Sequence, residues 1–264
     1  MDCMEGMKQF PDKYFDLAIV DPPYGIDIGQ ASMGVGGVLL HTPTGQRGCA
    51  PGGGNKRTIP FGGKRNPAFK SAEQLRSEAN PSGGGECIAP KIYKAFDDSH
   101  TPDAEYFKEL ERVAKHRIIW GGNYFLDFLG ATECMVTWDK KRRGMNFADC
   151  EIAWTDFKQP CRIYEFKWNG MLQQDMKNKE YRIHPTQKPV RLYEWLLLRF
   201  AKPGDIILDT HVGSASSLMA CRKTNHKYVG FEIDEDYYEL ARRRLDAEEA
   251  QMNLWDLGFN PYQE

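Results

Sequence analysis

Short apolar runs alternate with helical stretches along most of the chain, and this alternation constrains the fold more than any other feature. The runs are short and rich in β-branched and aromatic residues, which is typical of buried strands. They cover residues 16–20, 117–120, 134–138, 151–154, 162–166, 206–208 and 227–233. Strands that alternate with helices predict an α/β sheet with helices on both faces. The length of 264 residues predicts a single domain over 1–264.

Three helical stretches have recognisable boundaries. Thr101-Pro102 is typical of an N-cap followed by proline in the first helical turn. A second helix is expected from about residue 189 to 200, where Lys202-Pro203-Gly204-Asp205 predicts a turn. A third is expected to begin near Asp234. These helices separate the later strands of the predicted sheet.

A glycine-rich segment interrupts the alternation. Fifteen of the 25 glycines fall between Gly25 and Gly85, and residues 26–85 carry seven Lys or Arg against three acidic residues. Glycine raises the entropy cost of ordering a chain, so we expect a long basic loop inserted over 26–92. The whole chain has a formal net charge of -2, so contacts with nucleic acid must come from such local basic segments.

Several classes of protein are disfavoured by the composition. No apolar run approaches the roughly 20 residues that a membrane helix needs, and no basic segment followed by an apolar one suggests a signal peptide. The seven cysteines include no pair with CxxC spacing, which argues against a zinc site and fits reduced thiols. We therefore expect a cytoplasmic protein without membrane association and without a metal.

Asp21-Pro22-Pro23-Tyr24 follows directly after the first predicted strand, where ligand sites of open α/β sheets lie. The carboxylate of Asp21 can accept a hydrogen bond from an amino group. Pro22 and Pro23 stiffen the turn and leave its carbonyls free to accept. Tyr24 offers a flat face for a planar ring. These four residues are the predicted catalytic site, and a proline turn with an incidental tyrosine is the alternative.

This tetrapeptide resembles the catalytic motif of the DNA amino-methyltransferases, which methylate adenine N6 or cytosine N4 with S-adenosylmethionine. Aspartate in its first position favours adenine, because serine is commoner there in the cytosine-N4 enzymes. Residues 118–125 and 136–140 also look like segments of the adenine-specific members. Cytosine-N4 methylation is the nearest alternative. A non-catalytic DNA-binding protein with the same fold is another.

A second motif begins at Asp209, where the strand at 206–208 leads into a glycine turn and a helix. Gly213 lets the backbone approach a ligand, and Ser214 suits a helix cap. An ordinary strand-to-helix turn is the alternative. The segment resembles the family's cofactor loop, which implies that Asp209, Gly213 and Ser214 bind S-adenosylmethionine. It departs from the usual Asp-Pro-Phe-x-Gly-Ser-Gly-Thr at Thr210, His211 and Ala215.

Four further residues complete the predicted cofactor site. Glu232 ends a strand about twenty residues after the glycine turn, where a carboxylate can accept both ribose hydroxyls. The resemblance implies that Lys188 and Thr186, in a His-Pro-Thr-Gln-Lys-Pro segment, bind the carboxylate of the cofactor. It also implies that Asp2 contacts the cofactor adenine. His184 lacks a visible acid or base partner, so we interpret it as structural.

The catalytic motif precedes the cofactor loop by 188 residues, an order that resembles the β class of these enzymes. In that class the Rossmann-like methyltransferase sheet, about seven-stranded and mostly parallel, is circularly permuted. The two motif-bearing strands are then neighbours, and Asp21 and Asp209 face one crevice. The resemblance implies direct in-line methyl transfer to a base that is flipped out of the duplex.

Double-stranded DNA is the partner that the resemblance implies, often within a restriction-modification system. We expect contacts from the loop at 26–92, from Lys140-Lys141-Arg142-Arg143, and from a short target-recognition segment over 158–181. A homodimer is a further partner that the β class suggests. Gln251-Met252-Asn253-Leu254-Trp255 resembles a peptide that binds a sliding clamp, but so short a match favours a helix end with an apolar anchor.

Overall fold

The structure is a computed structural model that describes residues 1–26, 32–34, 37–39, 100–143, 148–169 and 172–256. Two compact units share the chain, one of residues 1–30 with 93–264 and one of residues 31–92. In the second unit, β2 (Ser32–Gly34) pairs antiparallel with β3 (Gly37–Leu39). The remainder of the loop predicted over 26–92 lies outside the described residues.

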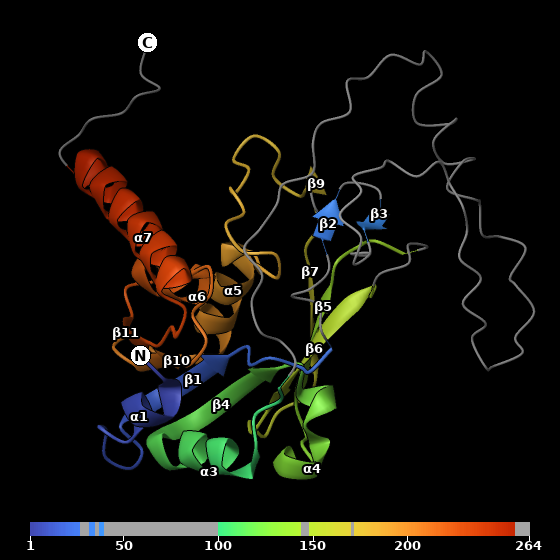
Figure 1. Cartoon of the computed structure of the whole chain (residues 1–264), viewed down its shortest axis with the longest axis vertical. Helices are drawn as coiled ribbons and strands as arrows, with labels where there is room; N and C mark the ends of the chain where they lie inside the picture. The colour runs from blue at the N-terminus through green and yellow to red at the C-terminus, as the bar shows by residue number, and fades with distance from the viewer. Residues whose placement is uncertain (27–31, 35–36, 40–99, 144–147, 170–171, 257–264) are drawn as a thin grey trace, which may run out of the picture. The chain divides into compact units, whose positions relative to one another are not determined.

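Seven strands of the first unit form one sheet in the order β11-β10-β1-β4-β6-β5-β7 (Figure 1). They are β1 (Phe15–Val20), β4 (Ala114–Trp120), β5 (Met135–Asp139), β6 (Cys150–Thr155), β7 (Arg162–Glu165), β10 (Ile206–Asp209) and β11 (Lys227–Gly230). All pairs are parallel except those of β6, which runs antiparallel to β4 and β5. The predicted α/β sheet is confirmed, although the strand expected over 227–233 ends at Gly230.

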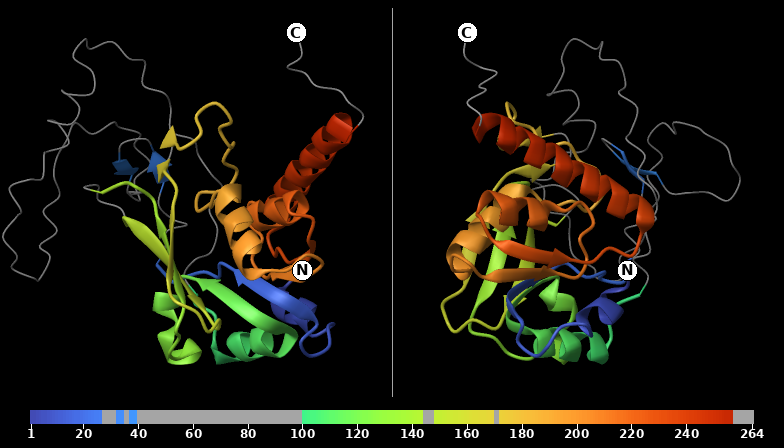
Figure 2. Two further views of the ribbon diagram at one scale, coloured as in Figure 1. Left: turned by 180° about the vertical axis from the view of Figure 1, so that it is seen from behind. Right: turned by 90° about the vertical axis from the view of Figure 1, so that its left-hand side faces the viewer.

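Helices cover both faces of this sheet (Figures 1 and 2). The described helical segments are α1 (Cys3–Met7), α3 (Ala104–Val113), η2 (Gly122–Tyr124), α4 (Leu126–Leu129), α5 (Val190–Phe200), α6 (Ser216–Lys223) and α7 (Glu235–Asp256). The side chains of β1 alternate between two cores, because successive residues of a strand point to opposite faces. Leu17 and Ile19 pack with α5 and α6, whereas Ala18 and Val20 pack with α3.

The central pair, β1 and β10, joins segments that are far apart in the sequence. Leu17 lies opposite Ile207 and Ala18 opposite Leu208 in a parallel register. The helices that follow the two strands leave to opposite faces, since α6 packs in one core and α3 in the other. A crevice forms at such a switch point, outside the carboxyl ends of the strands. Asp21 and Asp209 stand at this edge.

A short ladder of β8 (Trp168–Asn169) with β9 (Leu172–Gln173) lies between β7 and α5 in the chain. No helix in the described ranges is long and apolar enough to cross a bilayer.

The predicted start of α3 at Thr101-Pro102 is wrong. The N-cap is Asp103, whose carboxylate accepts hydrogen bonds from the backbone N–H groups of Glu105 and Tyr106, both at 3.0 Å. A charged acceptor satisfies two donors of the first turn that Thr101, two residues upstream, does not reach. The helix therefore begins at Ala104 and directs Tyr106 and Phe107 into the core.

Asp103→Ala is expected to lower the free energy of unfolding by about 1 kcal/mol, the usual cost of losing an N-cap. Thr101→Ala is the matched control and is expected to stay within about 0.5 kcal/mol of the parent, as surface substitutions do. Urea unfolding of the two variants measures the difference. An equal loss in both would contradict the cap at Asp103.

Candidate active site

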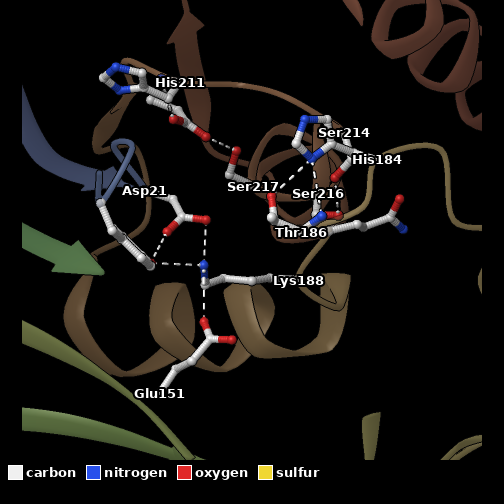
Figure 3. A network of polar contacts seen from close by, with 12 residues as sticks. Asp21, Glu151, His184, Thr186, Lys188, His211, Ser214, Ser216 and Ser217 are labelled. Atoms are coloured by element: carbon white, nitrogen blue, oxygen red, sulfur yellow. Dashed lines mark hydrogen bonds and ion pairs between the residues drawn. The ribbon is translucent and has the colours of Figure 1, made fainter. Parts of the chain in front are cut away.

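The carboxylate of Asp21 is the centre of a polar cluster at the carboxyl end of β1 (Figure 3). The Tyr24 hydroxyl donates to one of its oxygens and the Lys188 ammonium to the other. Lys188 also forms an ion pair with Glu151 at 3.1 Å and lies 3.4 Å from the Tyr24 hydroxyl oxygen. Residues from three separate parts of the chain thus meet at the predicted catalytic motif.

The charges of this cluster balance one another. Burial opposes charge on Lys188, but Asp21 and Glu151 raise its pKa, so the ammonium stays protonated. Burial likewise opposes charge on Glu151, yet Lys188 and Lys140 hold its pKa at about 2. Burial raises the pKa of Tyr24 well above its ordinary value, so its hydroxyl remains a donor. The cluster is therefore a fixed array of charged and hydrogen-bonding groups at neutral pH.

Glu151 was not predicted as a site residue. It lies near the start of β6, and strand starts usually lie at the edge of a sheet opposite the ligand site. Because β6 is antiparallel to β4 and β5, its first residues lie at the same edge as the last residues of those strands. The orientation of β6 was the missing information, since an acidic residue in a strand is no signal by itself.

Asp209 ends β10 and is almost completely buried, at 3% exposure. The Ser217 hydroxyl donates to one carboxylate oxygen, and the backbone N–H of His211 donates to the other at 3.0 Å. Burial raises the pKa of Asp209 to about 7 despite these two donors. Asp209 thus lies at the end of β10 as predicted, and in this structure its carboxylate is bonded to the following turn and to α6.

The turn after Asp209 has two residues in the left-handed region, Gly213 at φ +50° and Ala215 at φ +59°. The family's usual glycine at the second position fits this conformation without strain, which alanine does not. The prediction of Ser214 as a helix cap is wrong. Ala215 is the N-cap of α6 and makes no side-chain cap bond, while the Ser214 hydroxyl is 3.0 Å from that of Ser216.

Thr210 and His211 replace the family's proline and phenylalanine with a hydrogen-bonded pair. The Thr210 hydroxyl lies 2.9 Å from Nδ1 of His211 and 2.7 Å from the hydroxyl of Tyr106. Burial lowers the pKa of His211 to about 4, so the imidazole is neutral at pH 7. Its ring meets the Tyr106 ring edge-on at 5.6 Å. The replacements are therefore accommodated as buried polar groups with partners.

Arg244 of α7 fixes this turn from outside. Its guanidinium donates to the Ser214 carbonyl at 2.7 Å and to the Ser216 hydroxyl at 3.0 Å. The same side chain forms an ion pair with Glu180 at 3.0 Å. Glu180 in turn accepts a hydrogen bond from the backbone N–H of Val190, at the start of α5. One cation thus connects the turn to two other segments.

Glu232 follows β11 and faces the same turn. Its carboxylate accepts from the backbone N–H of Gly213 at 2.7 Å and from that of Asp234 at 2.9 Å. Asp234 itself accepts from the N–H groups of Asp236 and Tyr237 at the start of α7, as expected for a residue that starts a helix. A hollow of about 220 Å³ opens beside Glu232, with Val212, Phe231 and Tyr238 among its walls.

The remaining predicted cofactor residues have other bonds in this structure. The Thr186 hydroxyl lies 2.9 Å from Nδ1 of His184, whose ring packs edge-on against Tyr237 at 4.4 Å. Burial lowers the pKa of His184 to about 4, which fits its interpretation as a structural residue. Asp2 caps α1, accepting from the N–H groups of Met4 and Glu5.

No group of three or more His, Cys, Asp or Glu side chains could hold a metal ion in the part of the chain that the structure describes. The described cysteines are all free thiols.

The sheet is mostly parallel and has a switch point between β1 and β10. An aspartate and a glycine-containing turn follow β10, and a glutamate follows β11. Together these features define a Rossmann-like methyltransferase fold. Comparisons with known proteins agree. Residues 138–243 match the DNA methylase family N6_N4_Mtase. M2.DpnII, a Type II methyltransferase of Streptococcus pneumoniae, is 24% identical over 251 residues, which are 94% of this chain and 88% of that protein.

Two further similarities are limited, one in the length that it covers and the other in sequence identity. The DNA adenine methyltransferase YhdJ of Escherichia coli is 40% identical over 68 residues, 26% of this chain and 23% of that protein. The solved complex of M1.HpyAVI with S-adenosylmethionine covers 93% of this chain and 96% of its own, at 17% identity and a TM-score of 0.47. The match of residues 138–243 to the DNA methylase family agrees with the class predicted from the motifs.

The side chains around Glu232 fit an adenosyl group. A Cβ added at Gly213 would meet its nearest neighbour, His184, only at an ordinary van der Waals distance of 3.9 Å, so the turn is not crowded there. The carboxylate of Glu232 has acceptor sites beyond its two backbone bonds. Apolar walls in the adjoining hollow suit a nucleoside. The chemistry of these groups therefore matches a ribose and a planar ring.

Asp209→Asn is expected to remove one contribution to the pH dependence of the free energy of unfolding. The folded-state pKa of about 7 exceeds the ordinary 3.8, so the folded chain holds more protons between these values and loses stability as pH rises through this window. Asparagine does not ionise, so the variant lacks this loss, which is at most about 1.4 kcal/mol per pH unit.

Urea unfolding at pH 5, 6, 7 and 8 measures this effect. The stability of the Asp209→Asn variant relative to the parent should increase from pH 5 to about 7 and then level off. A difference that is constant over this range would contradict a carboxyl group that takes up its proton near neutrality.

Proposed function

We propose that the protein transfers the methyl group of S-adenosylmethionine to the N6 atom of adenine in double-stranded DNA. The observation that carries the proposal is the position of Asp21 and Tyr24 at the carboxyl end of β1, directly beside β10 and its glycine turn. Adenine is supported by aspartate at the first motif position and by the similarity to a relative named DNA adenine methyltransferase.

The chemistry requires that the exocyclic amine become a better nucleophile, because its lone pair is delocalised into the ring. The cofactor supplies an electrophilic methyl group on a sulfonium. Asp21 accepts one N–H of the amine and the Pro22 carbonyl the other, which localises the lone pair on nitrogen. The bonds of Tyr24 and Lys188 leave acceptor sites on the Asp21 carboxylate for this purpose. Tyr24 stacks on the flipped base, and orientation supplies most of the rate.

The proposed cofactor site comprises Asp209, Gly213 and Ser214 in the turn, and Glu232 at the ribose. The proposed site also includes Asp2, Thr186 and Lys188. Each of these side chains would exchange its present hydrogen-bonding partner for an atom of the cofactor. Lys188 is the clearest case, because its ammonium lies on Asp21 and Glu151 in this structure. A cofactor carboxylate within reach would compete for this cation.

DNA is proposed to contact the segment 158–181 and the basic residues near β5. Exposed Leu172, Met176 and Tyr181 support a contact surface in the first of these. The basic run at 140–143 is less available for DNA contacts than expected. Lys140 forms an ion pair with Glu151, and only 12% of the Lys140 side chain is exposed. Arg143 is 78% exposed and suits a phosphate contact.

Two other partners remain predictions. The backbone of the proposed clamp-binding peptide, Gln251–Trp255, lies within α7, which suits a helix end. A homodimer is proposed from the β class alone.

The experiment is transfer of labelled methyl from S-adenosylmethionine to unmethylated genomic DNA, followed by nucleoside mass spectrometry and sequencing of the modified DNA. N6-methyladenine is expected, at one recognition sequence. N4-methylcytosine as the product would leave the assigned fold unchanged and would make cytosine the target base instead of adenine. Cofactor binding without any methylated nucleoside would overturn DNA as the substrate, and absence of both would support a non-catalytic protein.

Asp21→Ala is expected to lower the rate of methyl transfer by at least about 100-fold, since a positioned group at the reacting atom contributes this much or more. Cofactor binding should persist, because Lys188 keeps its ion pair with Glu151 and the cluster retains a partner for its cation. Single-turnover transfer and calorimetry measure the two properties. Asp127→Ala, at an exposed position, is the control. Joint loss of transfer and cofactor binding would contradict the assigned role of Asp21.

A further inference from the structure

One short turn contacts the ring of Tyr24 at three points. The Tyr124 ring stacks on it, with centroids 5.1 Å apart and planes 16° apart. Phe125 meets it edge-on at 6.2 Å. A Cβ added at Gly121 would come within 2.2 Å of the Tyr24 Cε1 atom, so the glycine backbone lies against the ring. The turn that follows β4 therefore surrounds the predicted base-stacking residue.

The turn is itself firmly built. Gly121 adopts φ +66°, and the backbone N–H of Tyr124 donates to the Gly121 carbonyl at 2.8 Å. The Phe125 side chain is 1% exposed and anchors the turn in the core. Tyr124, in contrast, is 51% exposed, so its ring contributes little to the core. Its contact with another aromatic ring is the stack on Tyr24.

The stack adds to the contacts that restrain rotation of the Tyr24 ring. The Tyr24 ring is attached to the backbone at one end, and its hydroxyl is bonded to Asp21 at the other. Two fixed ends define an axis about which an aromatic ring can rotate, and Gly121 and Phe125 oppose this rotation at the edge of the ring. Such rotation changes the plane on which a base would stack. A parallel ring on one face opposes it.

We propose that Tyr124 is a positioning residue for methyl transfer, which holds the plane of the Tyr24 ring against which the target base stacks. This inference rests on the proposed function, because the base is the group that Tyr24 receives. Tyr124 acts through Tyr24 and needs only its aromatic face. Its hydroxyl has no part in the stack, so phenylalanine should replace it.

The experiment measures single-turnover methyl transfer to a duplex with the recognition sequence, with enzyme in excess. Tyr124→Ala is expected to slow the transfer about 3- to 10-fold, the range to which aromatic pair energies convert. Tyr124→Phe should restore the parent rate. Phe128→Ala is the control, because Phe128 is 48% exposed nearby but stacks on Phe107. Cofactor affinity should be unchanged in all three variants, and in urea unfolding Tyr124→Ala should lose no more stability than Phe128→Ala.

A double-mutant cycle with Tyr24→Ala decides whether Tyr124 acts through Tyr24. Once Tyr24 is absent, Tyr124→Ala should slow the residual transfer no further. If the two substitutions slow the transfer by the product of their separate factors, the inference is overturned. The same holds if Tyr124→Ala transfers at the parent rate, or if Tyr124→Phe is as slow as Tyr124→Ala. If Tyr24→Ala transfers nothing measurable, the Ala and Phe variants at position 124 decide by themselves. A parent enzyme that makes no N6-methyladenine would instead contradict the proposed function.

Discussion

The parallel pairing of β1 with β10 is the constraint on which the site depends. Leu17 opposite Ile207 and Ala18 opposite Leu208 place the carboxyl ends of two strands side by side, although 188 residues separate Asp21 from Asp209. The register is specified by burial on both faces, because a shift of one residue would exchange the side chains that face the two cores. The neighbouring positions of these two strand ends are thus a consequence of how two hydrophobic strands are buried.

The sheet was readily predicted mainly because its central strands, such as β1 and β10, are buried on both faces. Such strands appear in a sequence as continuous apolar runs, and all seven runs became the seven strands of the sheet. The positions of Asp21 and Asp209 followed from the same patterns, since each acid comes directly after such a run. The start of α7 was also predicted correctly, because the Asp234 side chain caps the first turn of the helix.

Other features depended on contacts that no local pattern encodes. Glu151 joins the site only because β6 runs against its neighbours, and strand direction is a property of the whole sheet. The partner of Lys188 could not be deduced either, because a lysine pairs with whichever carboxylates the fold brings near it. At α3, two capping residues stood two positions apart, and the better acceptor, Asp103, replaced Thr101. Competition between nearby groups determined the outcome at Lys188 and at α3, whereas strand direction determined it at Glu151.

The bond from Arg244 to the Ser214 carbonyl bears on the order in which the site is completed during synthesis. All seven strands of the sheet precede Arg244 in the chain, so they emerge from the ribosome before this cation does. Until then the turn at 209–215 lacks its outer restraint, and Glu180 lacks its counter-ion. Helix α7 therefore does more than cover the sheet, since a nascent chain that ends before it would carry all seven strands of this sheet but an unfinished turn at 209–215.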